Sequence, residues 1–76
     1  MIFEVKTLTG RKLVLDTNDY TTISEIKGYI QEKEGIEIRQ IRLISQGRSL
    51  TDNENINDIV KPEAKTIHMV LALRGG

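Results

Sequence analysis

The sequence of 76 residues has no cysteine and no tryptophan, and it contains only one proline and one histidine. Without cysteine the chain forms no disulfide and has no thiolate to attack a substrate or to hold zinc. Its single histidine, His68, has no second imidazole that would orient it as a catalytic base. The usual cysteine and histidine routes to catalysis are therefore closed.

Other catalytic patterns are missing as well. The carboxylates are scattered over positions typical of exposed residues, and no two are spaced as an acid–base pair. Gly75 and Gly76 have no helix behind them whose amides would bind a phosphate. One histidine and scattered carboxylates are also too few ligands for a metal. We expect no enzymatic activity, no metal and no bound cofactor.

Charge excess and long apolar runs are likewise lacking. Eleven basic residues balance eleven acidic ones, so bulk charge favours neither a nucleic acid nor a membrane surface as partner. No apolar run approaches the roughly 20 residues that span a bilayer. Glu4 and Lys6 interrupt the apolar start that a signal peptide would need. We expect one small, soluble, intracellular domain.

The first seventeen positions alternate between apolar and polar residues, which predicts a β-hairpin. Gly10 stands between its two halves and suits the positive φ of a bulged hairpin turn. The residues expected to face the core are Met1, Phe3, Val5, Leu13 and Leu15.

A helix is predicted after Thr22, because Thr22 and Glu25 form a capping box in which each side chain bonds the other's backbone amide. Gly35 is expected to end the helix as a left-handed C-cap. Gly28 lies inside it at a cost of up to about 1 kcal/mol relative to alanine, and nothing in the pattern explains it. The apolar stripe consists of Ile23, Ile26 and Ile30.

The second half of the chain predicts three more strands. Residues 39–45 and 66–72 form two of them, and residues 48–50 form a brief return after a turn. Residues 51–61 are polar and have room for one short helical turn. The apolar anchors around that segment are Leu50, Ile56 and Ile59. The order predicts an α+β fold, a mixed sheet with one helix packed across it.

Alternation along the strands places several apolar or amphipathic side chains on the solvent face. Ile44 points outward if its neighbour Leu43 faces the core. His68 and Val70 share the outward face of the last strand, and Leu8 stands at the hairpin tip. Isolated exposed apolar residues are normal, whereas several on one face form a patch typical of a binding site. The pattern alone leaves both interpretations open.

The last six residues differ from the polar end that most chains have. Leu71 and Leu73 are apolar, and Gly75-Gly76 carries no side chain, so it fits a slot too narrow for other residues. The terminal carboxylate has no steric shield. This suggests that the C-terminus is itself a reactant.

Several segments together carry a family resemblance. They are Val5-Lys6-Thr7-Leu8-Thr9-Gly10, Lys33-Glu34-Gly35-Ile36, Arg42-Leu43-Ile44, Gly47, Asp52, Asp58, His68, Val70-Leu71 and Leu73-Arg74-Gly75-Gly76. In these segments the chain resembles ubiquitin, in register over its whole length. The resemblance implies a β-grasp domain at 1–72, a flexible, exposed conjugation tail at 73–76, and the role of a protein modifier. An activating enzyme adenylates the C-terminal glycine of such a modifier with ATP. The glycine then passes between enzyme cysteines as a thioester and ends in an isopeptide bond to a target lysine.

The resemblance also implies the functional residues. Conjugation would use Gly75 and Gly76, and the activating enzyme would recognise Leu71, Ala72, Leu73 and Arg74. The main partner-binding surface, the outer patch, would consist of Leu8, Arg42, Ile44, Gly47, Arg48, His68 and Val70. A second apolar patch would be Ile36 with Leu71, and the candidate acceptor lysines are Lys6, Lys27 and Lys33.

Ala72 indicates one branch of the family. Ubiquitin has arginine there, and the run from Val70 to Gly76 resembles the Nedd/Rub branch, best known as modifiers of cullins. The activating enzyme of that branch carries an arginine that would repel an arginine at position 72 and accepts alanine. Arg48 and Glu63 replace the lysines of ubiquitin's main chain linkages, so we expect a poor builder of such polymers. Glu37-Ile38 replaces two prolines usual in both branches, which marks a divergent member.

The expected partners are activating and conjugating enzymes, ligases, deconjugating proteases and targets such as cullins, with ATP bound by the activating enzyme. The free protein is expected to be a monomer in the cytoplasm and nucleus. Two alternatives remain open. One is a divergent ubiquitin or another modifier with its own cascade. The other is a β-grasp interaction module that is never conjugated and keeps only the patch.

Overall fold

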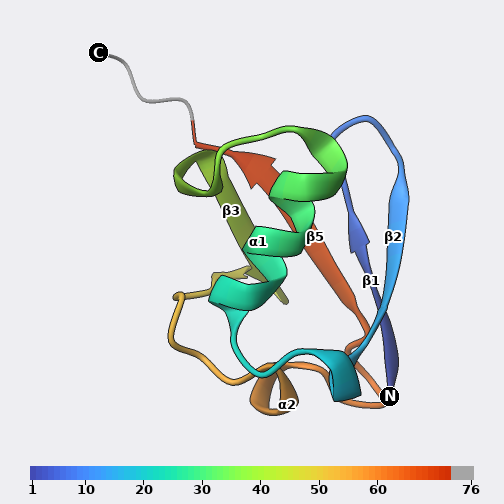
Figure 1. The fold of residues 1–76 in the computed structure, drawn as a ribbon. Helices are drawn as coiled ribbons and strands as arrows, with labels where there is room; N and C mark the ends of the chain where they lie inside the picture. Colours follow the sequence, from blue (N-terminus) through green and yellow to red (C-terminus); the bar gives the residue numbers. More distant parts are fainter. Residues whose placement is uncertain (73–76) are drawn as a thin grey trace.

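The computed structural model describes residues 1–72, in which a five-stranded mixed sheet carries one long helix across one face (Figure 1). The first half of the chain forms β1 (Ile2–Lys6), β2 (Lys12–Asp16), the 3-10 turn η1 (Thr17–Asp19) and α1 (Ile23–Glu34). The second half forms η2 (Ile38–Gln40), β3 (Ile41–Ser45), β4 (Arg48–Ser49), α2 (Ile56–Ile59) and β5 (Thr66–Leu71). The predicted α+β class is confirmed.

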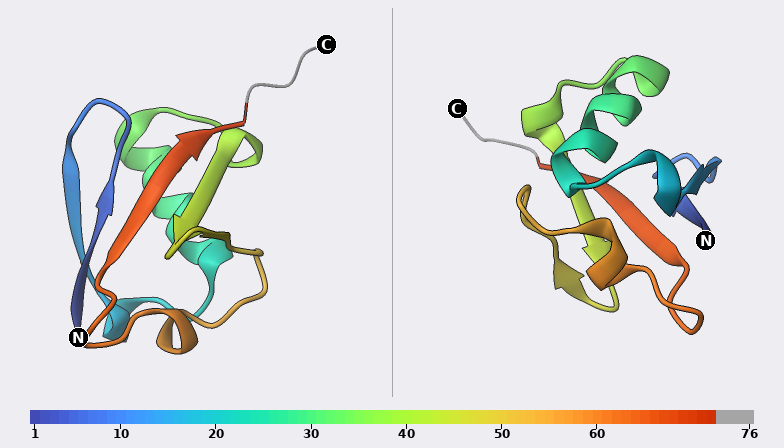
Figure 2. Two further views of the ribbon diagram at one scale, coloured as in Figure 1. Left: turned by 180° about the vertical axis from the view of Figure 1, so that it is seen from behind. Right: turned by 60° about the horizontal axis from the view of Figure 1, so that its bottom comes forward.

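The strands lie in the order β2-β1-β5-β3-β4, so the last strand of the chain becomes the central one. Strand β5 runs parallel to β1 and antiparallel to β3, and the other pairs are antiparallel. Figure 2 shows the sheet from the side that α1 does not cover. This order places side chains from both ends of the sequence next to each other on one face.

The core lies between the sheet and α1. The predicted stripe of Ile23, Ile26 and Ile30 is fully buried there, at 0% exposure for each side chain. The full cluster consists of Phe3, Val5, Leu13, Leu15, Ile23, Ile26, Ile30, Ile41, Leu43, Leu50, Ile56, Ile59, Val60, Ile67 and Met69. Burial of this continuous apolar surface drives the packing of the helix onto the sheet.

The predicted ends of α1 are confirmed. The Thr22 hydroxyl accepts a hydrogen bond from the Glu25 amide at 3.4 Å, and Glu25 Oε1 accepts one from the Thr22 amide at 3.4 Å. Gly35 ends the helix with φ of 69°, and its amide donates to the Gln31 carbonyl at 2.9 Å. Both caps satisfy backbone groups that the helix itself leaves unpaired.

Four expectations about the strands are wrong in detail. Met1 is 44% exposed rather than buried, because it precedes β1 and its ammonium group bonds Asp16 and Thr17 at the open end of the hairpin. The strand predicted from position 39 begins at Ile41, because the preceding residues form the turn η2. The return strand predicted over residues 48–50 ends at Ser49, and the last strand ends at Leu71, each one position before the predicted end.

Candidate functional site

The outward face of the sheet brings together residues from three separate parts of the sequence. In the pairing of β3 with β5, Ile44 lies opposite His68 and Arg42 lies opposite Val70. In the pairing of β1 with β5, Lys6 lies opposite His68. Paired residues point to the same side of a sheet, so one row of side chains crosses three strands.

Exposure of these residues agrees with an accessible surface. His68 is exposed, and Ile44 and Val70 are half-buried on the side of the sheet away from α1. Leu8 lies on the turn after β1 and is 61% exposed. The apolar side chains of β3 and β5 are neighbours rather than scattered single residues, which supports the patch interpretation of the sequence pattern.

The turn between β3 and β4 needs an unusual backbone. Gln46 has φ of 51° and Gly47 has φ of 77°, and Ser45 pairs with Arg48 across them. Two consecutive residues with positive φ are typical of a tight two-residue hairpin turn, and glycine adopts this conformation without steric cost. Gly47 is therefore needed to carry the chain from the patch strand β3 into β4.

Arg48 is held by Glu54, a residue that nothing in the sequence pattern indicated. The guanidinium nitrogens Nη1 and Nη2 donate to Glu54 Oε2 and Oε1 at 3.0 and 2.7 Å. The Thr51 amide also donates to Oε2, at 2.7 Å. The Arg48 bonds and the Thr51 amide lower the pKa of the Glu54 carboxyl to about 2.

Arg42 differs from Arg48 in this respect. It is exposed, and within residues 1–72 no carboxylate forms an ion pair with it. Its guanidinium is thus the more available cation of the two for an acidic group on a partner. The outer patch combines apolar contact area with one available arginine.

The end of the described chain is fastened to the turn before β3. Leu71 pairs with Ile41 at the end of β5, and the Ala72 amide donates to the Gln40 carbonyl at 2.7 Å. Leu71 is 37% exposed and Ala72 is half-buried. The other predicted tail residues, Leu73, Arg74, Gly75 and Gly76, lie outside the described residues.

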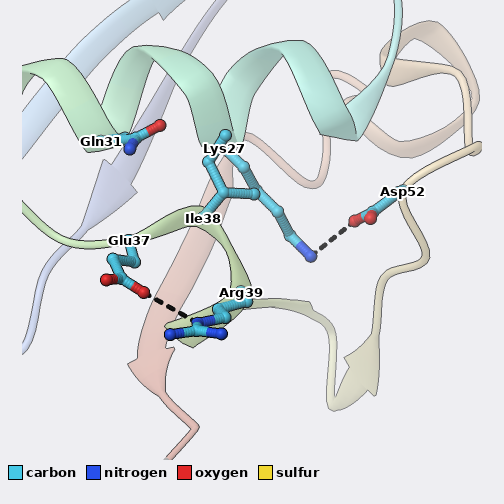
Figure 3. A pocket seen from close by; sticks show the side chains of 6 residues that line it. All are labelled: Lys27, Gln31, Glu37, Ile38, Arg39 and Asp52. Carbon is cyan, nitrogen blue, oxygen red and sulfur yellow. Dashed lines mark hydrogen bonds and ion pairs between the residues drawn. The ribbon is translucent and has the colours of Figure 1, made fainter.

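A hollow of about 620 Å³ lies beside this anchor, between α1, η2 and the loop before α2 (Figure 3). It is lined by Lys27, Gln31, Glu37, Ile38, Arg39 and Asp52. Lys27 Nζ lies 2.6 Å from Asp52 Oδ1, and Arg39 Nε lies 2.8 Å from Glu37 Oε2 (Figure 3). The four charges of the hollow therefore neutralise each other in pairs.

The remaining predicted residues have different surroundings. Ile36 is half-buried against the core, while Ile38, which the sequence pattern did not indicate, is 38% exposed on η2. Of the candidate acceptor lysines, Lys6 is half-buried on the outer face and Lys27 is the one paired with Asp52. Lys33 Nζ lies 5.7 Å from the centre of the Tyr29 ring.

Residues 1–72 contain no cluster of three or more histidine, aspartate or glutamate side chains arranged to hold a metal ion. Among the helices of that same part, none has both the length and the apolar character needed to cross a membrane.

Similarity to known proteins identifies the family to which the chain belongs. The ubiquitin family matches residues 3–74. Over 76 residues, the whole of this chain, identity is 42% to "Ubiquitin-like protein 1" of Schizosaccharomyces pombe, of which 97% is covered. Identity is 41% to "NEDD8-like protein RUB1" of Saccharomyces cerevisiae and 40% to "Ubiquitin-like protein NEDD8" of Dictyostelium discoideum, each over 76 residues and 99% of the relative.

These matches agree with the geometry. The mixed sheet with one long helix is the β-grasp arrangement of ubiquitin-like proteins. Similarity to Nedd8- and Rub-type proteins over the full chain supports a ubiquitin-like modifier. The chain therefore belongs to the ubiquitin family and, within it, resembles the Nedd8 and Rub proteins.

Proposed function

We propose that this protein is a modifier of the Nedd/Rub type, joined through the Gly76 carboxylate to lysines of target proteins, cullins among them. The observation that carries the proposal is similarity to Nedd8- and Rub-type proteins over the full chain, which contains Leu73-Arg74-Gly75-Gly76. The anchor of Ala72 on Gln40 supports it, because the terminal sequence begins directly after a fixed point on the domain.

The conjugation reactions require only one reactive group from this chain. The Gly76 carboxylate displaces pyrophosphate from ATP on the activating enzyme and becomes an acyl adenylate. An enzyme cysteine then displaces AMP to form a thioester, and a lysine amine of the target finally displaces the thiol. The cysteine and lysine nucleophiles of the later steps belong to other proteins, and ATP is bound by the activating enzyme. The absence of side chains at Gly75-Gly76 lets the reacting carbonyl enter a narrow channel.

Ala72 is proposed to select the activating enzyme. Its backbone is fixed by the bond to Gln40 and its small side chain is half-buried, so the position presents little bulk and no charge. An arginine at this position would bring a cation to a surface where the Nedd-type enzyme already has one. Two like charges without a counter-ion in an interface cost several kcal/mol.

The outer patch is proposed to bind conjugating enzymes, ligases and deconjugating proteases. Ile44 and Val70 supply apolar contact area, and Arg42 supplies a cation that no carboxylate of the described chain occupies. Clusters of this size commonly contain the few residues that dominate binding energy in an interface. We place the protein in the cytoplasm and nucleus, with these proposed partners.

A paired charging assay tests the proposal. The native chain and Ala72→Arg are each incubated with ATP and either a Nedd-type or a ubiquitin-type activating enzyme, and the thioester is detected on non-reducing gels. The native chain should charge the Nedd-type enzyme, and Ala72→Arg should shift charging to the ubiquitin-type enzyme. A chain that lacks Gly76 is the control and should charge neither. Charging of only the ubiquitin-type enzyme by the native chain would identify a divergent ubiquitin instead.

Targets are tested in cells of the source with a tagged chain. Purification under denaturing conditions and trypsin digestion should recover cullin peptides in which a lysine carries a Gly-Gly remnant, since trypsin cleaves after Arg74. The same chain without Gly75-Gly76 should give no adducts. If the intact tagged chain also gives none, the protein is a β-grasp interaction module that is never conjugated.

A further inference from the structure

The outward side of α1 carries a second hollow that neither the outer patch nor the tail uses. It has a volume of about 560 Å³ and is lined by Tyr20, Glu25, Gly28, Tyr29, Gln31 and Glu32, which together form the tyrosine–glutamate groove. Helix α1 covers the face of the sheet opposite the outer patch (Figure 2). A partner in the groove would therefore leave the outer patch free.

Two tyrosines form a fixed aromatic wall. The ring centres of Tyr20 and Tyr29 lie 5.9 Å apart, with the ring planes at 66°, in an edge-to-face arrangement. Both rings are partly buried against the core, which holds them in place. Burial chiefly raises the pKa of the Tyr20 hydroxyl, and the nearby charges of Tyr29, Asp19 and Glu32 raise it further.

The charged side chains that line the groove are all carboxylates. Glu25 and Glu32 line it, although the whole chain is neutral at pH 7. Glu25 Oε1 accepts bonds from two backbone amides of the helix cap, which fixes the direction of that carboxylate. Glu32 forms no ion pair within residues 1–72. The groove thus places two carboxylates beside two aromatic rings, and Lys33 contacts one of these rings.

Gly28 explains why the groove is open. It lies between Glu25 and Glu32 at the i−3 and i+4 positions, which are neighbours on one face of a helix. A Cβ built on Gly28 meets no atom within 4 Å, so close packing does not require glycine there. Gly28 weakens the helix and has no packing role, so its presence is explained if the missing side chain leaves room for another molecule.

A contact within the chain shows that the tyrosine wall accepts a positive charge. Lys33 Nζ lies 5.7 Å from the centre of the Tyr29 ring, in a cation–π contact. Aromatic faces beside carboxylates are the surroundings that favour a guanidinium, which stacks on a ring and donates in a plane to a carboxylate.

We propose that the tyrosine–glutamate groove binds an arginine side chain of a partner protein, with the guanidinium against the tyrosine wall and Glu32 as its hydrogen-bond acceptor. The Gly28 backbone is the open floor that admits the side chain. This interaction goes beyond the proposed conjugation and needs neither the tail nor an activating enzyme.

A titration of the full-length, ¹⁵N-labelled chain tests this binding. The probe is the blocked peptide acetyl-Gly-Arg-Gly-Arg-Gly-amide, and the matched control has citrulline in place of each arginine, with nearly the same shape and no charge. Saturable shifts of the Gly28, Tyr29 and Glu32 amide signals are expected with arginine only. Equal shifts with citrulline, shifts confined to the outer patch, or no saturable shift in the groove would each overturn the proposal.

Variants at the floor and wall make the test specific. Gly28→Lys fills the groove with its own cation and should weaken binding of the arginine peptide at least tenfold. Its thermal unfolding should occur at a temperature equal to or higher than that of the native chain. Gly28→Ala adds one methyl group to the floor and should weaken peptide binding, but less than Gly28→Lys does. Glu32→Gln should weaken binding several-fold, and Glu63→Gln, outside the groove, should not. Native-like binding by Gly28→Lys would show that the arginine sits elsewhere.

Discussion

The two outward surfaces of this small domain have opposite chemistry. The outer face of the sheet joins half-buried aliphatic residues to cations, with Arg42 and Lys6 around Ile44 and Val70. The outward side of α1 joins aromatic rings to carboxylates around one glycine. A formal net charge of +0 therefore conceals a basic, apolar surface and an acidic, aromatic one.

The difference follows from how each element distributes its residues. A strand alternates strictly, so every second residue of β3 and β5 faces solvent and neighbouring strands line these residues up. A helix buries one stripe and leaves a wide arc outward, where a missing side chain opens a groove along the axis. Since sheet and helix are separate layers, the two surfaces can be occupied independently.

The largest effect expected is on stability, and it tests whether β3 has two distinct faces. Leu43 is completely buried at 0% exposure, and its neighbour Ile44 is half-buried on the outer side. Leu43→Ala should lower the free energy of unfolding by about 2–5 kcal/mol, because it removes core contacts and leaves a cavity. Ile44→Ala should lower the free energy of unfolding by clearly less than Leu43→Ala does. Urea unfolding followed by circular dichroism measures both, and equal losses would place Ile44 in the core.

Binding through the outer patch is the next largest effect. Ile44→Ala should weaken binding of the conjugation enzymes by about 1–3 kcal/mol, as expected for the centre of an interface. Calorimetry with a Nedd-type conjugating enzyme provides the measurement. Val14→Ala is the matched control, because Val14 is also aliphatic and 63% exposed on the outer face, but lies on β2 away from the patch. Equal losses for the two variants would remove the reason to single out the patch.

A smaller effect on stability distinguishes Gly28, inside α1, from Gly35, the residue that caps its C-terminus. Gly28→Ala should raise the free energy of unfolding by about 0.5–1 kcal/mol, since alanine favours helix and the new methyl group meets nothing. Gly35→Ala should lower it, because Gly35 has φ of 69° and a Cβ is strained there. Thermal and urea unfolding measure both changes. A loss of stability for Gly28→Ala would mean that this glycine has a structural role.

The smallest effect concerns the ion pair that withdraws Arg48 from the basic surface. The pKa of Glu54 is lowered from 4.5 to about 2 in the folded protein, so the pair stabilises the fold above pH 4.5 and this contribution is lost as pH falls toward 2. Urea unfolding across this range should show the decline in the native chain. Glu54→Gln should lack this part of the decline, and Arg48→Gln should keep only the share that comes from the Thr51 amide. An unchanged decline in both variants would contradict the assignment.

Features that depend on neighbouring residues were predictable. The capping box at Thr22, the C-cap at Gly35 and the stripe of α1 follow from bonds and spacings within one segment. The outward position of Ile44 follows from strand alternation. Where local bonding competes with the pattern, prediction failed: the residues before Ile41 close a 3-10 turn, with the Gln40 amide bonded to the Glu37 carbonyl at 2.9 Å, instead of extending β3.

The sequence by itself determined the elements and the core faces, because backbone hydrogen bonds and apolar periodicity act over a few residues. Only the tertiary structure decided that β5 lies between β1 and β3, which brings His68 between Lys6 and Ile44. It also decided that Glu54 holds Arg48 and that Tyr20 meets Tyr29 in the groove that Gly28 also lines. These contacts depend on strand order and on the packing of the chain around one core, which no short window of sequence contains.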